Sequence, residues 1–329
     1  MLYSPNNHGE HDNPCKQSLH KLILLTRGFR PTPNIIAASP SSCASDLAEA
    51  VGAAQREAQS AFGDGRVFIE KYIPRSRHVE IQILADTHGI LVHLFERECS
   101  IQRRHQKIIE ETPSPLLDSD LRERMTKSAL AAARAVNYTN AGTVDFIVDA
   151  NTREFYFLEM NTRLQVEHPV TEMVTGIDLV QEQIRIAAGE ALTFSQSEIN
   201  SRGHAIECRI YAEDPASEFL PAAGPVLLFA PPQGPGIRLD TGVASGDEVT
   251  GYYDPLMAKL VVHAAHREAA LRRMEFALRE VTILGLTTNI SFLQDLMANS
   301  EFQSGEHTTA LIEERYGDWR CLSPRRLLN

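Results

Sequence analysis

Hydrophobic positions along this chain recur with two periods, and the change from one period to the other separates helices from strands. From Asp46 the apolar residues recur at helical spacing as far as the Gly-Asp-Gly turn at 63–65. Helical spacing returns at 121–136, which is rich in alanine, and at 177–188, which ends before a glycine. The pattern therefore predicts three helices in the first two thirds of the chain.

Period-two alternation predicts strands between these helices. Glu80 and Gln82 alternate with valine and isoleucine, which predicts a hairpin with one polar face. The predicted strands are 67–69, then 79–83 and 90–95 in one hairpin, and 144–148 and 154–160 in another. After a polar stretch at 193–203, short strands alternate with Pro/Gly turns until two closing helices. The first 44 residues show no sustained period, which predicts a loose leader.

Composition narrows the functional class. With 329 residues and 43% hydrophobic content the chain can bury a full core, and its length suggests two domains. A net charge of -11 disfavours nucleic acid as a partner, and no apolar run approaches the roughly 20 residues of a membrane span. The five cysteines form no CxxC pair, and we expect a reducing compartment, cytoplasm or mitochondrial matrix, without a secretory signal.

The densest candidate site is the stretch at 159–172, EMNTRLQVEHPVTE, where polar residues take alternate positions from the end of a predicted strand. Such positions share a face, so we expect five polar groups to line one side; they are Glu159, Asn161, Arg163, Gln165 and Glu167. Carboxylate and amide oxygens are the ligands that Mg²⁺ prefers, and the neighbouring Asp145 completes that set. The alternative is a solvated strand.

Two roles remain open for Glu167. A carboxylate held near cations can act as a general base, and the Arg163 guanidinium is suited to a small oxyanion such as bicarbonate. Glu167 can equally be an ion-pair partner of Arg163, and spacing alone does not choose between these roles.

A second cluster lies at 96–115, ERECSIQRRHQKIIEETPSP, where basic residues stand between two acidic groups. A basic run is usually a solvated face, and a nucleic-acid patch is the next alternative. The flanking glutamates favour instead a cationic loop that neutralises phosphate or bicarbonate in a cleft lined by carboxylates.

These stretches, with FIEKYIPRSRHVEIQ at 68–82, GHAIECRIYAEDP at 203–215 and GYYDPLMAKL at 251–260, resemble the biotin carboxylases, which are ATP-grasp ligases. The resemblance runs from about residue 45 to 316 and is closest to acyl-CoA carboxylases of the methylcrotonoyl or propionyl type. It implies an α+β fold with a partial ATP-grasp domain at 45–202, on an antiparallel sheet, and a biotin carboxylase C-terminal domain at 203–316. Residues 1–44 are then an atypical, disordered leader, and 317–329 a tail.

The resemblance also assigns roles to residues. It implies ATP contacts at Glu70, Lys71, Ile73, His78, Gln102, His105, Asp145 and Glu159, and metal ligation by Asp145, Glu159 and Asn161. Asp145 stands where the family usually has Glu, one methylene longer. Lys107, Arg163, Gln165 and the Val166 backbone match the bicarbonate site, Glu167 the general base, and Arg209 the arginine that stabilises the biotin enolate.

The implied reaction is carboxylation of biotin by bicarbonate through carboxyphosphate, with ATP and Mg²⁺ or Mn²⁺. Implied partners are a biotin-carrier domain, a carboxyltransferase subunit and a second copy in a homodimer. We expect the chain to lack the family's N-terminal domain and glycine-rich lid, since its first 44 residues hold only Gly9 and Gly28. Two hypotheses follow: an enzyme module, or an impaired or non-catalytic fragment that keeps the fold and a dimer or ATP-binding surface.

Overall fold

The computed structural model of the chain describes residues 20–24, 36–37 and 44–320, and it divides into two compact units, residues 1–74 and 75–329. In the first unit β1 (His20–Leu24) pairs with β2 (Ile36–Ala37) and β3 (Phe68–Lys71), and α1 (Ala44–Phe62) buries Ala54 and Ala58. The leader predicted to be disordered thus contains two strands. Its other residues up to 43 lie outside the described part, as do 321–329 of the predicted tail.

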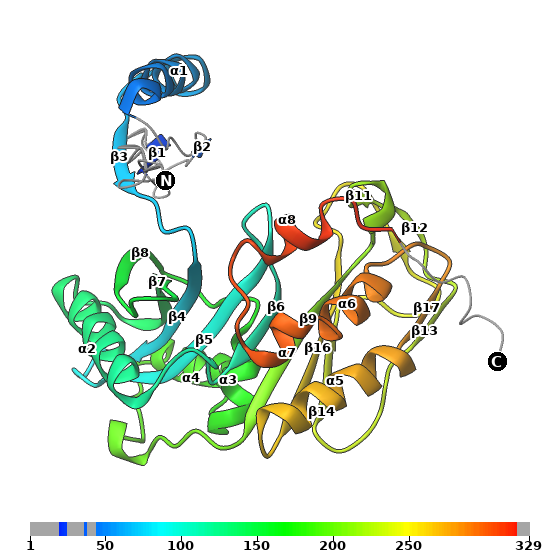
Figure 1. The fold of residues 1–329 in the computed structure, drawn as a ribbon. Coiled ribbons are helices and arrows are strands. Elements are labelled where there is room, and N and C mark those ends of the chain that lie inside the picture. The colour runs from blue at the N-terminus through cyan, green and yellow to red at the C-terminus, as the bar shows by residue number, and fades with distance from the viewer. Residues whose placement is uncertain (1–19, 25–35, 38–43, 321–329) are drawn as a thin grey trace, which may run out of the picture. The chain divides into compact units, whose positions relative to one another are not determined.

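One antiparallel eight-stranded sheet organises the second unit (Figure 1). Its strands are, in spatial order, β14 (Ile237–Thr241), β16 (Leu256–Ala264), β9 (His204–Tyr211), β6 (Gln106–Thr112), β5 (Leu91–Arg103), β4 (Ser76–Ala85), β7 (Asn140–Asp149) and β8 (Phe155–Asn161). Both predicted hairpins are present, as β4–β5 and β7–β8. Strand β6 pairs with β9, so strands from both sides of residue 202 share this sheet.

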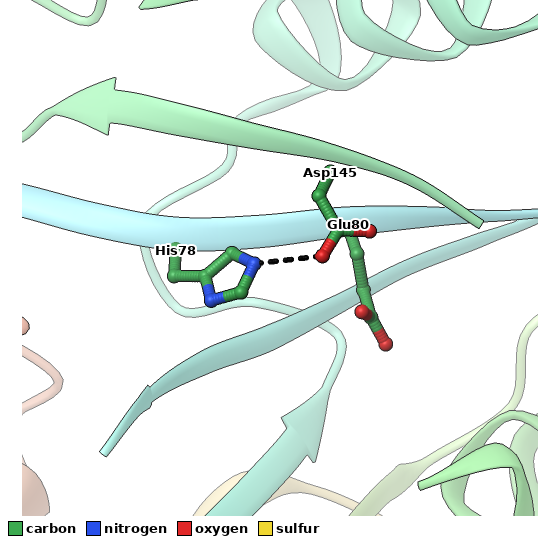
Figure 2. A group of neighbouring side chains, drawn as sticks. All are labelled: His78, Glu80 and Asp145. Carbon is green, nitrogen blue, oxygen red and sulfur yellow. Dashed lines mark hydrogen bonds and ion pairs between the residues drawn. The ribbon is translucent and has the colours of Figure 1, made fainter. Parts of the chain in front are cut away.

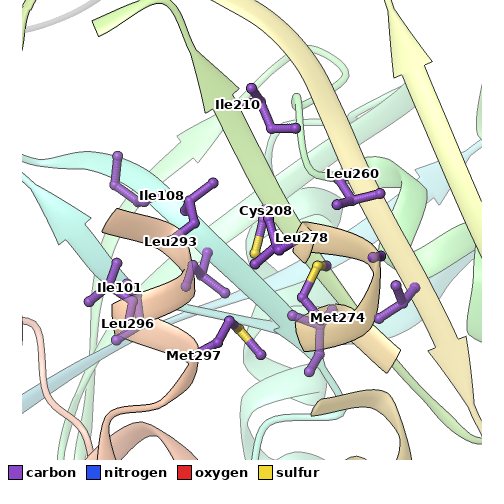
Figure 3. Close-up of a cluster of buried hydrophobic side chains, with 14 of the residues drawn as sticks. Ile101, Ile108, Cys208, Ile210, Leu260, Met274, Leu278, Leu293, Leu296 and Met297 are labelled. Carbon is purple, nitrogen blue, oxygen red and sulfur yellow. The ribbon is translucent and has the colours of Figure 1, made fainter. Parts of the chain in front are cut away.

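Helices cover both faces of the sheet. On one face lie α2 (Ser119–Ala135), α5 (Arg267–Glu280), α6 (Ile290–Met297), α7 (Ser300–Ser304) and α8 (Leu311–Tyr316). Four described helices follow residue 203, where alternation predicted two, because short polar-rich segments carry little periodic signal. Their apolar residues join those of β5, β6, β9 and β16 in the largest core cluster (Figure 3). We call this the core face.

The opposite face carries α3 (His168–Thr175) and α4 (Leu179–Ala187). Here Val170 and Val174 pack on Ala205 and Val261, while polar residues occupy the centre of the sheet. Glu80 and Gln82, the polar face of the first predicted hairpin, are both 0% exposed. Polar groups kept out of water in this way need partners, and they therefore mark a candidate site. We call this the site face.

Small antiparallel pairs complete the unit. They are β10 (Glu213–Asp214) with β11 (Leu220–Pro221), β12 (Gly224–Pro225) with β15 (Glu248–Val249), and β13 (Leu228–Ala230) with β17 (Thr282–Leu284). Arg104 and His105 form the two-residue turn between β5 and β6, both with positive φ, as this tight hairpin class requires. No described helix is long and apolar enough to cross a membrane.

Candidate active site

The β4–β7 pair contributes His78, Glu80 and Asp145, all buried on the site face (Figure 2). His78 Nε2 lies 3.0 Å from Asp145 Oδ2, and the Thr143 hydroxyl donates to Asp145 Oδ1 at 3.1 Å. Because Glu80 and Asp145 are direct cross-strand partners, their carboxylates project from the same face. The three side chains form one compact group of potential cation ligands among the described residues.

Glu80 joins this group to the cationic residues of β5 and β6. Its Oε1 accepts from Arg97 Nε at 2.5 Å, and its Oε2 accepts from Lys107 Nζ at 2.6 Å. Arg97 also donates to Gln82 Oε1 and to the Thr171 hydroxyl on α3. Arg97 therefore holds β4, β5 and α3 together under the site, since charged hydrogen bonds in a buried setting are strong and directional.

Glu167 lies between two cations that come from distant parts of the chain. Its Oε1 accepts from Lys107 Nζ at 2.5 Å, and its Oε2 accepts from an Arg209 terminal nitrogen at 2.9 Å. Arg209 donates its Nε to Glu110 Oε1 at 2.6 Å. Acidic and basic side chains thus alternate across β4, β6, β9 and the start of α3. Glu167 forms its ion pairs with Lys107 and Arg209.

The segment from Arg163 to Glu167 is not a continuation of the strand, because β8 ends at Asn161. The prediction of five alternating positions on one strand is therefore wrong after that residue. A turn carries the segment instead to the start of α3, where Glu167 is the N-cap residue. Exposed Arg163 donates to Gln165 Oε1 at 2.6 Å, and Lys259 Nζ donates to the Val166 carbonyl at 3.1 Å. A turn, and not a continued strand, therefore brings these groups to the site face.

The predicted metal ligands lie on the neighbouring strands β7 and β8, on the same face of the sheet. Asp145 faces Glu159 across the β7–β8 pair, and Thr143 faces Asn161. Asp145 is buried whereas Glu159 is exposed, and Glu159 does not belong to the compact group around His78 in the described chain. The donor set of two carboxylates and one amide oxygen suits a hard divalent cation such as Mg²⁺.

The predicted nucleotide contacts fall in both compact units. Partly buried Gln102 on β5 is the cross-strand partner of Lys107, and exposed His105 is in the adjoining turn. Glu70 and Lys71 lie on β3, and the buried Ile73 follows it, all within the first unit. The structure thus brings Lys107, Glu167 and Arg209 into direct contact, with Gln165 two residues from Glu167, and leaves the β3 residues in the other unit.

Electrostatics at the site are set by burial acting against ion pairing. Burial alone would raise the pKa of Glu167, but Lys107, Arg209 and Arg97 hold that pKa well below its usual range. Burial lowers the pKa of Lys107, yet the surrounding acidic groups raise it well above its usual value overall. Burial raises the pKa of the neighbouring Cys99 thiol, which therefore stays protonated.

Sequence patterns gave no role to several residues of this cluster. Arg97, Cys99, Glu110 and Lys259 lie on strands whose pairing order is β16, β9, β6, β5, and that order is not visible in any local pattern. One signal was available for Glu80, because its alternation with valine and isoleucine places it on the polar face of the hairpin, although alternation alone does not show that this face is buried.

Comparison with known proteins defines the class. Residues 41–195 match the family described as carbamoyl-phosphate synthase L chain, ATP binding domain, and residues 207–314 match the biotin carboxylase C-terminal domain. The fold and the site thus combine an ATP-binding domain with a carboxylase domain.

The chain belongs to the biotin carboxylase family. It is 55% identical over 262 residues to a biotin carboxylase of Nostoc sp., and this match covers 80% of this chain and 58% of that protein. It is 52% identical to the mitochondrial methylcrotonoyl-CoA carboxylase subunit alpha of Rattus norvegicus, over 83% of this chain and 38% of that protein. The chain therefore spans about two fifths to three fifths of these relatives.

Solved structures agree. The Hydrogenobacter thermophilus 2-oxoglutarate carboxylase biotin carboxylase domain dimer, in complex with MgADP, ADP and bicarbonate, superposes with a TM-score of 0.81 at 43% identity, over 91% of this chain and 65% of that one. A biotin carboxylase–beta-gamma-ATP complex from Campylobacter jejuni gives a TM-score of 0.80 at 42% identity, over 90% of this chain and 65% of that one. The predicted ATP-grasp and biotin carboxylase α+β fold is confirmed.

Proposed function

We propose that this chain carries out the ATP- and magnesium-dependent carboxylation of biotin by bicarbonate. The observation that carries the proposal is Glu167, a buried carboxylate that lies between Lys107 and Arg209. A base flanked by two cations can take a proton from bicarbonate while the cations retain the resulting dianion. The solved domain that binds MgADP and bicarbonate is similar to this chain over 91% of its length.

The low pKa of Glu167 is compatible with a role as base because its cause is removable. Lys107 and Arg209, the first cations that lower it, are also the groups that we propose to contact bicarbonate and the biotin enolate. When bicarbonate shares these cations, Glu167 loses part of their stabilisation and becomes more basic. Arg163 and Gln165, joined by a hydrogen bond, supply further donors on the exposed side.

The steps follow from these positions. Glu167 removes the proton of bicarbonate, and the bicarbonate oxygen attacks the γ-phosphate of ATP to give carboxyphosphate and ADP. Lys107 neutralises charge during this transfer. Carboxyphosphate breaks into carbon dioxide and phosphate, the phosphate takes the ureido proton of biotin, and Arg209 stabilises the enolate, which attacks carbon dioxide.

Asp145, Glu159 and Asn161 are the residues that would hold Mg²⁺ or Mn²⁺ on the β7–β8 pair. When bound, such a cation neutralises phosphate charge. His78, which contacts Asp145, and Gln102, the cross-strand partner of Lys107, are further proposed ATP contacts, and these two neighbours support that role. Glu70, Lys71, Ile73 and His105 complete the proposed ATP contacts, and the Val166 backbone completes the bicarbonate site.

Biotin itself arrives as a substrate on a carrier domain, and a carboxyltransferase subunit would use the product. The solved 2-oxoglutarate carboxylase domain is a dimer, which supports a homodimer here. The domains proposed for this assembly are 45–202 and 203–316, which share the central sheet.

The test is bicarbonate-dependent ATP cleavage by the 329-residue chain, measured with and without free biotin. Glu167→Gln should reduce this cleavage by about 100- to 10,000-fold, the usual contribution of a positioned base. Exposed Glu190→Gln is the matched control and should keep wild-type turnover. Equal turnover by the Glu167 variant and the wild type would contradict the proposed mechanism, and a wild type without cleavage would support a non-catalytic fragment.

A further inference from the structure

A second pair of carboxyl groups lies beside Arg209. Glu110 on β6 and Glu207 on β9 are direct cross-strand partners, and both are 0% exposed. Arg209 is two residues from Glu207 on the same strand and therefore on the same face. Its Nε donates to Glu110, and its terminal nitrogen Nη2 contacts both Glu110 and Glu167, so one guanidinium bridges these two carboxyl groups.

Three of the four carboxyl oxygens of the Glu110–Glu207 pair have no hydrogen-bond partner among the described residues. They are Oε2 of Glu110 and both oxygens of Glu207. Two adjacent buried carboxylates with a single donor between them, Arg209, repel one another and lose their hydration, whereas a proton on one of them removes the repulsion. The charged groups that face the pair are Arg209 and Lys259 on neighbouring strands, Lys107 on β6, and Glu167.

The cation placement decides which member carries the proton. Arg209 donates directly to Glu110, whereas neither oxygen of Glu207 has a hydrogen-bond partner in the described part of the chain. Burial raises the pKa of Glu207 well above its usual range and Glu110 raises it further, while burial raises the pKa of Glu110 to about 7 against the opposing effect of Arg209. Both observations leave the negative charge on Glu110 and the proton on Glu207.

We propose that Glu110 is a positioning residue that holds the Arg209 guanidinium in place, and that Glu207 is a neutral carboxylic acid, so that the Glu110–Glu207 pair carries a single negative charge. The inference rests on the proposed function. When Glu167 takes a proton it becomes neutral, and Arg209 loses one of its two ionised partners at the moment when a biotin enolate needs the cation. Glu110 holds the guanidinium in place through that step. Because Glu207 is neutral, it does not further offset the positive charge of Arg209.

The two glutamates allow a matched comparison, because Glu→Gln keeps the size of each side chain and alters only its charge or proton. Infrared difference spectra should show the carbonyl band of a protonated carboxyl group at about pH 8, where exposed carboxyls are ionised. Glu207→Gln should lose that band and Glu110→Gln should keep it. Loss of the band in Glu110→Gln, or its retention in Glu207→Gln, would overturn the assignment, and this measurement needs no enzyme activity.

Turnover supplies the second readout. Glu110→Gln should reduce biotin-dependent turnover by about 10- to 100-fold, the usual cost of removing a group that orients a reacting residue. Biotin-independent ATP cleavage and the KM for ATP should change much less, and Glu207→Gln should have a smaller effect than Glu110→Gln. Equal losses in both variants, or in both reactions, would indicate a structural role and overturn the proposal. If the wild type itself lacks cleavage, the proposed function fails while the infrared result still locates the proton.

Discussion

Glu110 and Glu111 are neighbours on β6, and the strand places them on opposite faces of one sheet. Both are fully buried, yet their surroundings differ. Glu111, on the core face, accepts from His204 at 2.7 Å and from two nitrogens of Arg267 at 2.7 and 2.9 Å. Glu110, on the site face, accepts from Arg209 and has a second glutamate opposite, on β9.

The pKa directions follow from this difference. Burial acts to raise both, but His204 and Arg267 hold the pKa of Glu111 well below its usual range, whereas the pKa of Glu110 is raised to about 7. A carboxylate enclosed by donors stabilises the fold, while one left short of donors can exchange protons or partners. We infer that the core face uses its charges for stability and the site face uses them for chemistry.

The strongest test on the core face is Arg267→Met. It leaves the Glu111 carboxylate buried with only His204, and breaking such a pair typically costs about 3–5 kcal/mol of unfolding free energy. Urea unfolding measures this loss. Exposed Arg272→Met, on the same helix α5, is the control and should change stability by less than about 0.5 kcal/mol. Similar losses in both variants would show that the buried Arg267–Glu111 pair stabilises the fold no more than an exposed arginine does.

On the site face, Lys107→Met should damage activity more than stability. Each carboxylate that loses the lysine keeps an arginine, because Glu80 retains Arg97 and Glu167 retains Arg209. Bicarbonate-dependent ATP cleavage should fall by about 100- to 1000-fold, as for removal of a preorganised cation or donor. Exposed Lys127→Met is the control. An unfolding midpoint lowered as far as in Arg267→Met would erase the contrast between the faces.

A pH test follows from His307, which is buried on the core face between charged residues. Burial, with Arg77 opposing protonation, lowers its pKa to about 4. Between its usual value near 6.5 and that pKa the unfolded chain binds a proton that the folded chain refuses, so stability falls as pH decreases, by about 3 kcal/mol. His307→Gln should remove this slope in urea unfolding at pH 7 and about pH 4.5. An unchanged slope would place the pH sensitivity elsewhere.

The smallest expected effect is that of Arg122→Met. Arg122 on α2 binds Glu96 on the core face, but its side chain is 27% exposed. Water can reach part of the vacated space, and Glu96 keeps the Ser114 amide, so the loss should be about 1–2 kcal/mol. Turnover should stay at the wild-type level. A loss as large as that for Arg267→Met would show that the exposed fraction of the arginine does not determine how much each ion pair stabilises the fold.

Local patterns predicted much of the fold and part of the site. The Ala-rich helix, both hairpins and the glycine-terminated helix were visible because spacing of 3.6 or 2 residues reports which side of an element is buried. The family motifs brought out Lys107, Glu167 and Arg209, and the structure places them in contact. The strand alternation assumed after Asn161 was wrong, since a turn and a helix N-cap bring Glu167 to the site.

By itself the sequence determined the longer elements, the family and the residue types that reach the site, because these depend on near neighbours along the chain. Tertiary structure alone decided that β6 lies between β5 and β9, and this order brings Glu110 opposite Glu207 and Arg209 to Glu167. Proton affinity depends on burial and on charges a few ångströms away, whatever their separation in sequence. Glu110 and Glu111 are adjacent in sequence, yet the residues that set their charges lie up to 156 positions away.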